Sequence, residues 1–252
     1  MARYDFRTPR IFLDAPLAPG ARLALGADQA NYLVNVLRRR DGAPVLVFNG
    51  RDGEWQATLA AAGKKQFVLV VAAQTRPQPA PGDLHYWFAP LKAARLDYMV
   101  QKAVEMGATR LTPVLTQHTQ AERVNIRRMR ANAIEAAEQC GILAPPKIDA
   151  PMPLAAALAA HDPQRLLVFC DEDADVTDPV AALAAAAAAA PERPVAVTVL
   201  VGPEGGFAAA ERGALLKLPR VVRLSLGPRI LRADTAAVAA LALVGAVIGD
   251  WR

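Results

Sequence analysis

Leu200-Val201-Gly202-Pro203-Glu204-Gly205-Gly206-Phe207 is the stretch that decides the fold of this chain. It continues the apolar, β-branched run Val195–Val201, which predicts a buried strand, and it leads into a short helix expected over Ala208–Leu216. Glycines in such a turn permit positive φ angles and let a ligand approach the backbone closely. Ligands of parallel α/β sheets bind at the carboxyl ends of strands, so this loop is predicted to bind one. The alternative is a tight turn without a ligand.

The spacing of these glycines excludes the common nucleotide motifs. It is neither GxGxxG nor GxxxxGK[ST], and no lysine or hydroxyl is positioned for magnesium and phosphates. A conventional nucleoside triphosphate site is therefore not expected.

A second glycine loop follows the expected strand Val221–Leu224. It reads Ser225-Leu226-Gly227-Pro228-Arg229-Ile230-Leu231-Arg232-Ala233 and precedes a final helix over Asp234–Ile248, with Asp234 or Thr235 as its N-cap. Large apolar loop residues can wall an adenine ring while backbone groups read its edge. Alternatively, they fill the core and leave the arginines in solvent. Because both Gly-Pro loops end a strand, we predict that they lie side by side and form one pocket.

The rest of the chain predicts two domains. Residues 1–75 favour a small β-barrel of short strands, and the Pro-rich stretch that ends at Gly82 predicts a linker over 76–82. From residue 83 to 252, strands alternate with helices, which indicates an α/β fold with a largely parallel sheet. The expected elements are strands at Arg10–Leu13, Pro44–Phe48, Glu54–Leu59, Gln66–Ala72, Leu84–Ala89, Arg110–Leu115 and Arg165–Cys170, and helices at Asp28–Arg38, Lys92–Met106, Asn125–Cys140 and Pro179–Ala190, the last capped by Asp178.

Composition limits the function classes. The formal net charge is +5 over 252 residues, which favours a polyanionic partner without requiring one. The two cysteines have no metal-ligand spacing, so neither a zinc site nor a disulfide framework is expected. The charged N-terminus is no signal peptide and the apolar runs are too short to span a bilayer, so we expect a cytoplasmic protein without membrane contact.

Two helices carry polar groups at helical spacing. Glu135, Glu138 and Gln139 share one face of the expected helix Asn125–Cys140, and a solvated face is the favoured interpretation. Lys102 and Glu105 lie one turn apart, as in an exposed ion pair.

These motifs, taken in order, carry a family resemblance. The chain resembles the 16S ribosomal RNA uridine-N3 methyltransferases of the SPOUT class over nearly its full length. The motifs are Lys102-Ala103-Val104-Glu105-Met106-Gly107, Glu138-Gln139-Cys140-Gly141, Gly202-Pro203-Glu204-Gly205-Gly206 and Leu226-Gly227-Pro228-Arg229-Ile230-Leu231-Arg232.

The resemblance implies a PUA-like RNA-binding barrel followed by an α/β methyltransferase domain with a trefoil knot. It implies S-adenosylmethionine as the cofactor, 16S rRNA of the small ribosomal subunit as the partner, and a homodimer with the active site at the subunit interface. The product would be N3-methyluridine in the decoding region.

The resemblance also assigns residues. Those expected at the cofactor are Leu200, Gly202, Pro203, Glu204, Gly205, Gly206, Leu226, Gly227, Ile230, Leu231, Arg232 and Thr235. Arg232 is expected to stabilise charge on the uracil oxygens, with Asp234 or Glu204 as general base. Basic residues expected to bind RNA are Arg10, Arg38, Arg39, Arg40, Lys92, Arg127 and Arg128.

Three positions depart from the family pattern, and two other functions stay open. Asp234 stands where Glu is frequent, Ile142 where Arg is common and Asn31 where His is frequent. One alternative is a non-catalytic RNA-binding ribosome-assembly factor, and the other is a SPOUT enzyme that acts on another RNA position.

Overall fold

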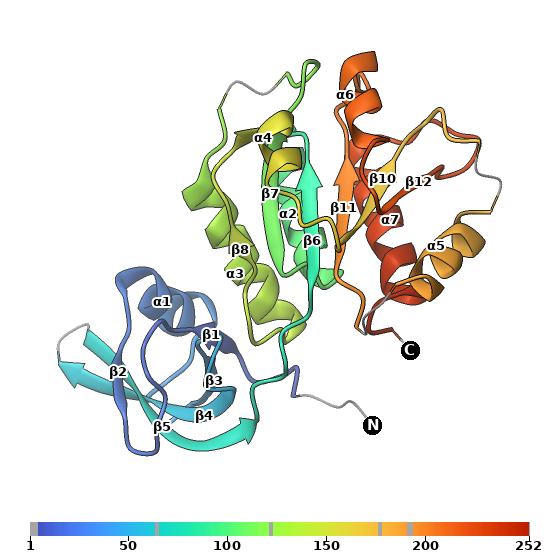
Figure 1. The fold of residues 1–252 in the computed structure, drawn as a ribbon. Helices are drawn as coiled ribbons and strands as arrows, with labels where there is room; N and C mark the ends of the chain where they lie inside the picture. Colours follow the sequence, from blue (N-terminus) through green and yellow to red (C-terminus); the bar gives the residue numbers. More distant parts are fainter. Residues whose placement is uncertain (1–4, 64–65, 121–122, 176–177, 191–193, 252) are drawn as a thin grey trace. The chain divides into compact units, whose positions relative to one another are not determined.

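The computed structural model describes residues 5–63, 66–120, 123–175, 178–190 and 194–251 (Figure 1). The chain divides into two compact units: unit 1 comprises 1–81 and 134–145, and unit 2 comprises 82–133 and 146–252. The segment 134–145 therefore departs from the expected division, which assigned it to the second domain. It contains the end of helix α3 (Ile126–Cys140), whose backbone is bonded to side chains of unit 1, as described below.

Unit 1 is a five-stranded sheet curled around one core. Its strands run in the order β1-β3-β4-β5-β2, with β1 parallel to β3 and the other pairs antiparallel. All five strands contribute to one hydrophobic cluster, so the sheet has to curl. The strands are β1 (Arg10–Phe12), β2 (Arg22–Ala24), β3 (Pro44–Phe48), β4 (Glu54–Gly63) and β5 (Gln66–Arg76).

Three features of unit 1 differ from the sequence prediction. Strand β5 continues to Arg76, into the expected linker, because Arg76 pairs with Glu54 in the ladder. Strand β2 was missed, since it is three residues long and buries only Leu23. The expected helix is shorter: α1 (Ala27–Asn31) gives way to a π-helical turn over Tyr32–Val36, in which the N–H of Leu37 donates to the carbonyl of Tyr32 at 2.9 Å.

Unit 2 has a parallel sheet in the order β12-β10-β11-β6-β7-β8. This confirms the predicted α/β class with a parallel sheet. The strands are β6 (Leu84–Phe88), β7 (Arg110–Leu115), β8 (Lys147–Ile148), β10 (Leu166–Cys170), β11 (Val197–Val201) and β12 (Val221–Leu224), and β9 (Met152–Pro153) pairs with β7. The two-residue strands β8 and β9 were not predicted, because so short a run has no readable period.

Helices cover both faces of this sheet. Helices α2 (Ala93–Glu105) and α5 (Pro179–Ala188) each pack against α7 (Ala233–Val247), and α4 (Leu154–Ala159) packs with α6 (Ala209–Leu215) (Figure 1). Strand β11 lies between them with all five residues buried, as its apolar sequence requires. Among the described residues, no helix is long and apolar enough to cross a membrane.

The N-caps of two helices can be compared with the sequence prediction. Asp178 caps α5 as expected, because its side chain accepts a hydrogen bond of 2.9 Å from the N–H of Ala181. The predicted cap of α7 was wrong: the helix begins one residue earlier, with Arg232 at the N-cap and no side-chain capping bond. The Asp234 carboxylate instead accepts from the N–H of its neighbour Thr235.

Candidate active site

A cavity of about 600 Å³ lies where β10, β11 and β12 end. Both predicted glycine loops line it, through Gly202, Pro203, Glu204 and Gly206 on one side and 224–231 on the other. However, β11 and β12 are not neighbours, because β10 lies between them in the sheet. The loop after β10 therefore lines the cavity as well, a contribution that the sequence did not reveal because Asp171 and Glu172 stand in no glycine motif.

The loop after β11 is packed so closely that its glycines are required. A Cβ atom on Gly202 would lie 2.4 Å from the ring of Phe207, which packs edge-on against Phe169 with ring centroids 5.0 Å apart. Gly206 has a φ of 68°, which favours glycine, and a Cβ there would lie 2.9 Å from Oε1 of Glu172. This backbone therefore borders the cavity without side chains between.

The loop after β7 supports this turn from outside the cavity. Nδ1 of His118 lies 3.0 Å from the carbonyl oxygen of Gly205 and 3.2 Å from that of Gly206. A carbonyl only accepts, so these contacts require the proton on Nδ1. His118 could not be predicted from the sequence, because it stands in no motif and lies 87 residues before Gly205.

Fewer residues of the loop after β12 and of the start of α7 line the cavity than predicted. Leu226, Gly227, Ile230 and Leu231 line the cavity, but the Ile230 side chain is 96% exposed. Arg232 is exposed at the N-cap of α7, and Thr235 is also exposed. Among the residues that line the cavity, neither these two nor Asp234 appears.

Leu200, predicted at the cofactor, has its side chain in the core and is not among the residues that line the cavity, so its role at the cofactor stays a prediction. Its side chain is fully buried and packs with Trp87, Phe169 and Leu215. Residues alternate between the two faces of a strand, so a core position inside β11 does not open into the cavity at the strand end.

Charge at the cavity floor is concentrated on Asp171. Its buried carboxylate pairs with Arg212 at 3.0 Å and with Arg223 at 2.8 Å. Arg212 also pairs with Asp173. Beside them, burial raises the pKa of the Cys170 thiol to about 12, so the thiol stays neutral near pH 7 and is a poor nucleophile.

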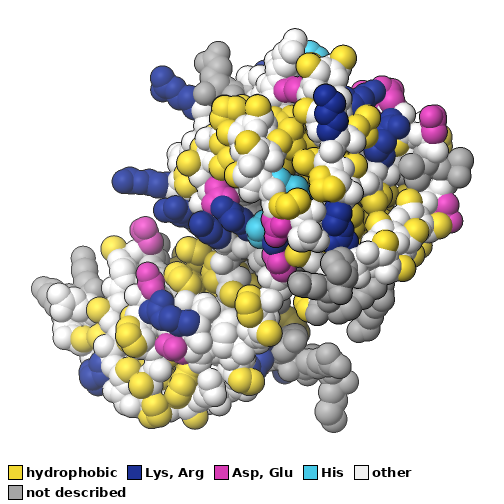
Figure 2. Space-filling model, in the orientation of Figure 1, with side chains coloured by type: hydrophobic (Ala, Val, Ile, Leu, Met, Phe, Trp, Pro, Cys, Tyr) yellow, Lys and Arg dark blue, Asp and Glu magenta, His cyan; other side chains and the backbone are white. Residues whose placement is uncertain are grey.

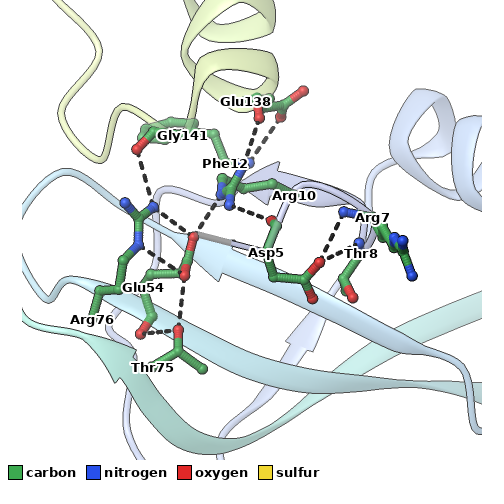
Figure 3. Close-up of polar contacts among 10 residues, drawn as sticks. All are labelled: Asp5, Arg7, Thr8, Arg10, Phe12, Glu54, Thr75, Arg76, Glu138 and Gly141. Carbon is green, nitrogen blue, oxygen red and sulfur yellow. Dashed lines mark hydrogen bonds and ion pairs between the residues drawn. The ribbon is translucent and has the colours of Figure 1, made fainter. Parts of the chain in front are cut away.

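Arg10, predicted to bind RNA, is instead a structural residue of unit 1 (Figure 3). Its Nε donates to Oε2 of Glu54 at 2.6 Å, and both side chains are almost completely buried. Although burial opposes ionisation, hydrogen bonds from Arg76, Arg10 and Thr75 lower the pKa of the Glu54 carboxyl. An arginine enclosed in this way cannot reach a phosphate.

The same cluster explains the Glu138-Gln139-Cys140-Gly141 motif (Figure 3). The carbonyl of Glu138 accepts from Arg10 at 3.1 Å, and the carbonyl of Gly141 accepts from Arg76 at 3.0 Å. The solvated face expected here was wrong for Glu138, whose side chain is half-buried and accepts from the N–H of Phe12. Burial raises the pKa of Glu138 to about 7. The motif fixes the end of α3 to unit 1 and does not contribute to the cavity.

The other residues predicted to contact RNA differ in how exposed their side chains are. Arg38, Arg40, Lys92 and Arg127 are exposed and Arg39 is partly buried. On the face shown in Figure 2, Lys and Arg side chains lie in separate groups among hydrophobic and acidic ones.

Arg128 is also exposed, but its guanidinium pairs with Asp97 at 2.5 Å. Hydrogen bonding to Arg128 lowers the pKa of the Asp97 carboxyl.

Among the described residues, no group of three or more His, Cys, Asp or Glu side chains is arranged to hold a metal ion.

Comparison with known families gives two matches. The family described as "RNA methyltransferase domain" matches residues 78–245, which is most of unit 2. The family described as "RNA methyltransferase PUA domain" matches residues 25–72, within unit 1. The α/β unit and the β unit are thus matched separately and in the expected order.

Named relatives cover nearly the whole chain. "Ribosomal RNA small subunit methyltransferase E" of Rickettsia conorii is 29% identical over 93% of this chain and 94% of its own length. The protein of that name from Synechocystis is 30% identical over 90% of this chain and 74% of its own. A solved putative methyltransferase from Legionella pneumophila, in complex with S-adenosylmethionine, is 28% identical with a TM-score of 0.83, covering 97% of this chain and 99% of that one.

Proposed function

Because the chain belongs to the RNA methyltransferase family, we propose that it transfers a methyl group from S-adenosylmethionine to N3 of a uridine in 16S rRNA of the small ribosomal subunit. The relatives named for small-subunit rRNA methylation support the reaction class, and the cofactor in the related Legionella structure supports the methyl donor. The observation that carries the proposal is the cavity of about 600 Å³ at the ends of β10, β11 and β12.

The cavity fits such a donor in two respects. Its volume lies in the range of small-molecule sites, and its apolar lining from Leu226 and Leu231 suits an adenine ring. On the other side, the backbone at Gly202 and Gly206 leaves no room for side chains, so carbonyl and N–H groups can approach the ligand. When bound, S-adenosylmethionine supplies an electrophilic methyl group.

The protein has two tasks in the reaction. Uridine N3 carries a proton that must be removed before its lone pair can attack, and negative charge then spreads onto the uracil oxygens. We assign charge stabilisation to Arg232. Of the two proposed bases, Glu204 lines the cavity and Asp234 does not, so Glu204 is favoured as the proton acceptor.

Phosphate contacts are proposed for exposed cations. Arg38 and Arg40 of unit 1 and Lys92 and Arg127 of unit 2 fit this role, because their side chains are exposed. RNA affinity should therefore fall steeply with salt concentration. Arg10 does not belong to this set, because its side chain is buried against Glu54.

A homodimer is proposed as well. The Ile230 side chain borders the cavity and is 96% exposed, so a second subunit that covers it would bury apolar surface and complete the site. Light scattering in solution tests this directly, and a monomer at micromolar concentration would contradict it.

The deciding experiment for the reaction is methyl transfer to RNA. Labelled S-adenosylmethionine should transfer its methyl group to 16S rRNA from a strain that lacks the enzyme, and the product should map to N3 of one uridine. RNA binding without transfer would favour an assembly factor instead. Transfer to a ribose or to another base would assign a different RNA position.

A further inference from the structure

We propose that Glu172 is a specificity-determining residue that binds the α-ammonium group of the methionine part of the cofactor. The inference rests on the proposed function and deepens it, because it assigns the end of the cavity that holds the amino-acid tail. Glu172 stands in none of the motifs that identify the family. It is placed at the cavity only by the position of β10 between β11 and β12.

Glu172 lies beside the loop after β11. Its Oε1 atom would lie 2.9 Å from a Cβ built on Gly206, so the carboxylate borders the loop after β11. The opposite loop lines the cavity with Leu226 and Leu231, while Val201 and Phe207 add apolar lining on the β11 side. An adenine ring placed against Leu226 and Leu231 directs the methionine tail across the end of β10, toward Glu172 and Gly206.

The charges around the cavity floor also favour a cationic ligand group at Glu172. Around the floor, the carboxylates of Asp171, Glu172 and Asp173 outnumber the guanidiniums of Arg212 and Arg223, which leaves an excess of one negative charge. Arg212 lines the cavity too, but it pairs with Asp171 and Asp173. Among the described residues, the exposed Glu172 side chain has no ion pair or hydrogen bond, and it interacts with Arg212 only at longer range. A ligand cation would give this carboxylate a direct partner.

Of the two cationic groups of the cofactor, the ammonium suits Glu172 better than the sulfonium does. An ammonium group donates three hydrogen bonds, and a carboxylate only accepts, so the two are complementary. A sulfonium has no N–H or O–H donor. The other lining carboxylate, Glu204, already has a cation nearby, because Oε1 lies 3.8 Å from Arg95. Glu172 is therefore the better partner for the amino group.

Three ligands show whether Glu172 binds the ammonium, the sulfonium, or the ribose and adenine. S-adenosylmethionine carries both the ammonium and the sulfonium, S-adenosylhomocysteine carries only the ammonium, and methylthioadenosine carries neither but keeps the ribose and adenine. We expect Glu172→Gln to weaken binding of the first two by about tenfold, the effect of losing one charged hydrogen bond, and to leave methylthioadenosine within twofold of the wild type. Calorimetry on the full chain measures all three dissociation constants.

Matched variants make the outcomes decisive. Glu204→Gln should change the three affinities by less than Glu172→Gln does. An equal loss for all three ligands would overturn the inference, because it would mean a ribose contact or a structural role. A loss confined to S-adenosylmethionine would overturn it in favour of the sulfonium, as would an amino-selective loss in Glu204→Gln alone. If the wild type bound none of these ligands, the proposed function itself would fail, and the inference with it.

Discussion

The backbone N–H of Phe12 donates a hydrogen bond of 2.9 Å to Oε1 of Glu138, which joins β1 to the last turn of α3. Burial raises the pKa of this carboxyl to about 7 from an ordinary value of 4.5. The folded protein therefore binds a proton more tightly than the unfolded chain does. Between pH 4.5 and 7 the unfolded state holds fewer protons, so stability falls as pH rises through this window.

Glu138→Gln should remove this pH dependence, because the amide oxygen keeps the bond from Phe12 without carrying charge. At pH 8 we expect the variant to be more stable than the wild type by on the order of 1 kcal/mol, with no difference near pH 4.5. Urea denaturation at the two pH values measures it. Glu135→Gln, an exposed position on the same helix, should give a smaller effect in the same direction, because the Glu135 charge also raises the pKa of Glu138. A variant less stable than the wild type at pH 8 would show that the charged form is favoured in the fold.

His118 should support cofactor binding from outside the cavity. Its ring bonds to the carbonyls of Gly205 and Gly206, so His118→Ala frees the turn while removing no lining side chain. We expect S-adenosylmethionine affinity to fall about fivefold, the effect of one neutral hydrogen bond. Calorimetry tests this, with Gln117→Ala as the control because that exposed side chain is adjacent in sequence. Equal affinities for the two variants would remove His118 from this role.

Arg232→Ala should separate chemistry from binding. Arg232 is exposed at the N-cap of α7 and does not line the cavity, so we expect the cofactor dissociation constant to stay within twofold of the wild type. The rate of methyl transfer should fall by about a hundredfold or more, because a donor to the developing oxyanion is lost. Arg232→Lys, which keeps the charge, should recover part of the rate. Single-turnover transfer from labelled cofactor is the measurement, and a wild-type rate in the alanine variant would exclude Arg232 from the mechanism.

The elements with a local signal could be predicted from the sequence. The run Val197–Val201 is apolar and β-branched and is followed by glycines, so both the strand and its loop could be predicted. The order β12-β10-β11 could not be predicted, because strand order depends on pairing between distant segments. Glu172 was missed for that reason. Arg10 was misassigned because its partner Glu54 lies 44 residues away, and an isolated arginine is expected in solvent.

Gly202 tests whether close packing of the loop is needed for the cavity. In Gly202→Ala the new Cβ would meet the Phe207 ring at 2.4 Å, and Phe207 is already packed against Phe169. Overpacking of this kind costs about 1–3 kcal/mol, so we expect a lower free energy of unfolding and at least tenfold weaker cofactor binding.

Gly213→Ala is the matched control, because Gly213 lies inside α6 and a Cβ there meets nothing within 4 Å. The same chemical change should stabilise the protein by about 0.5–1 kcal/mol, since alanine loses less backbone entropy in a helix than glycine, and should leave binding unchanged. Opposite changes in the free energy of unfolding, together with weaker cofactor binding in Gly202→Ala alone, would locate the requirement for glycine in the loop. If Gly202→Ala bound the cofactor as the wild type does, Phe207 would be free to move aside without closing the cavity. Close packing of this loop would then not be needed for cofactor binding.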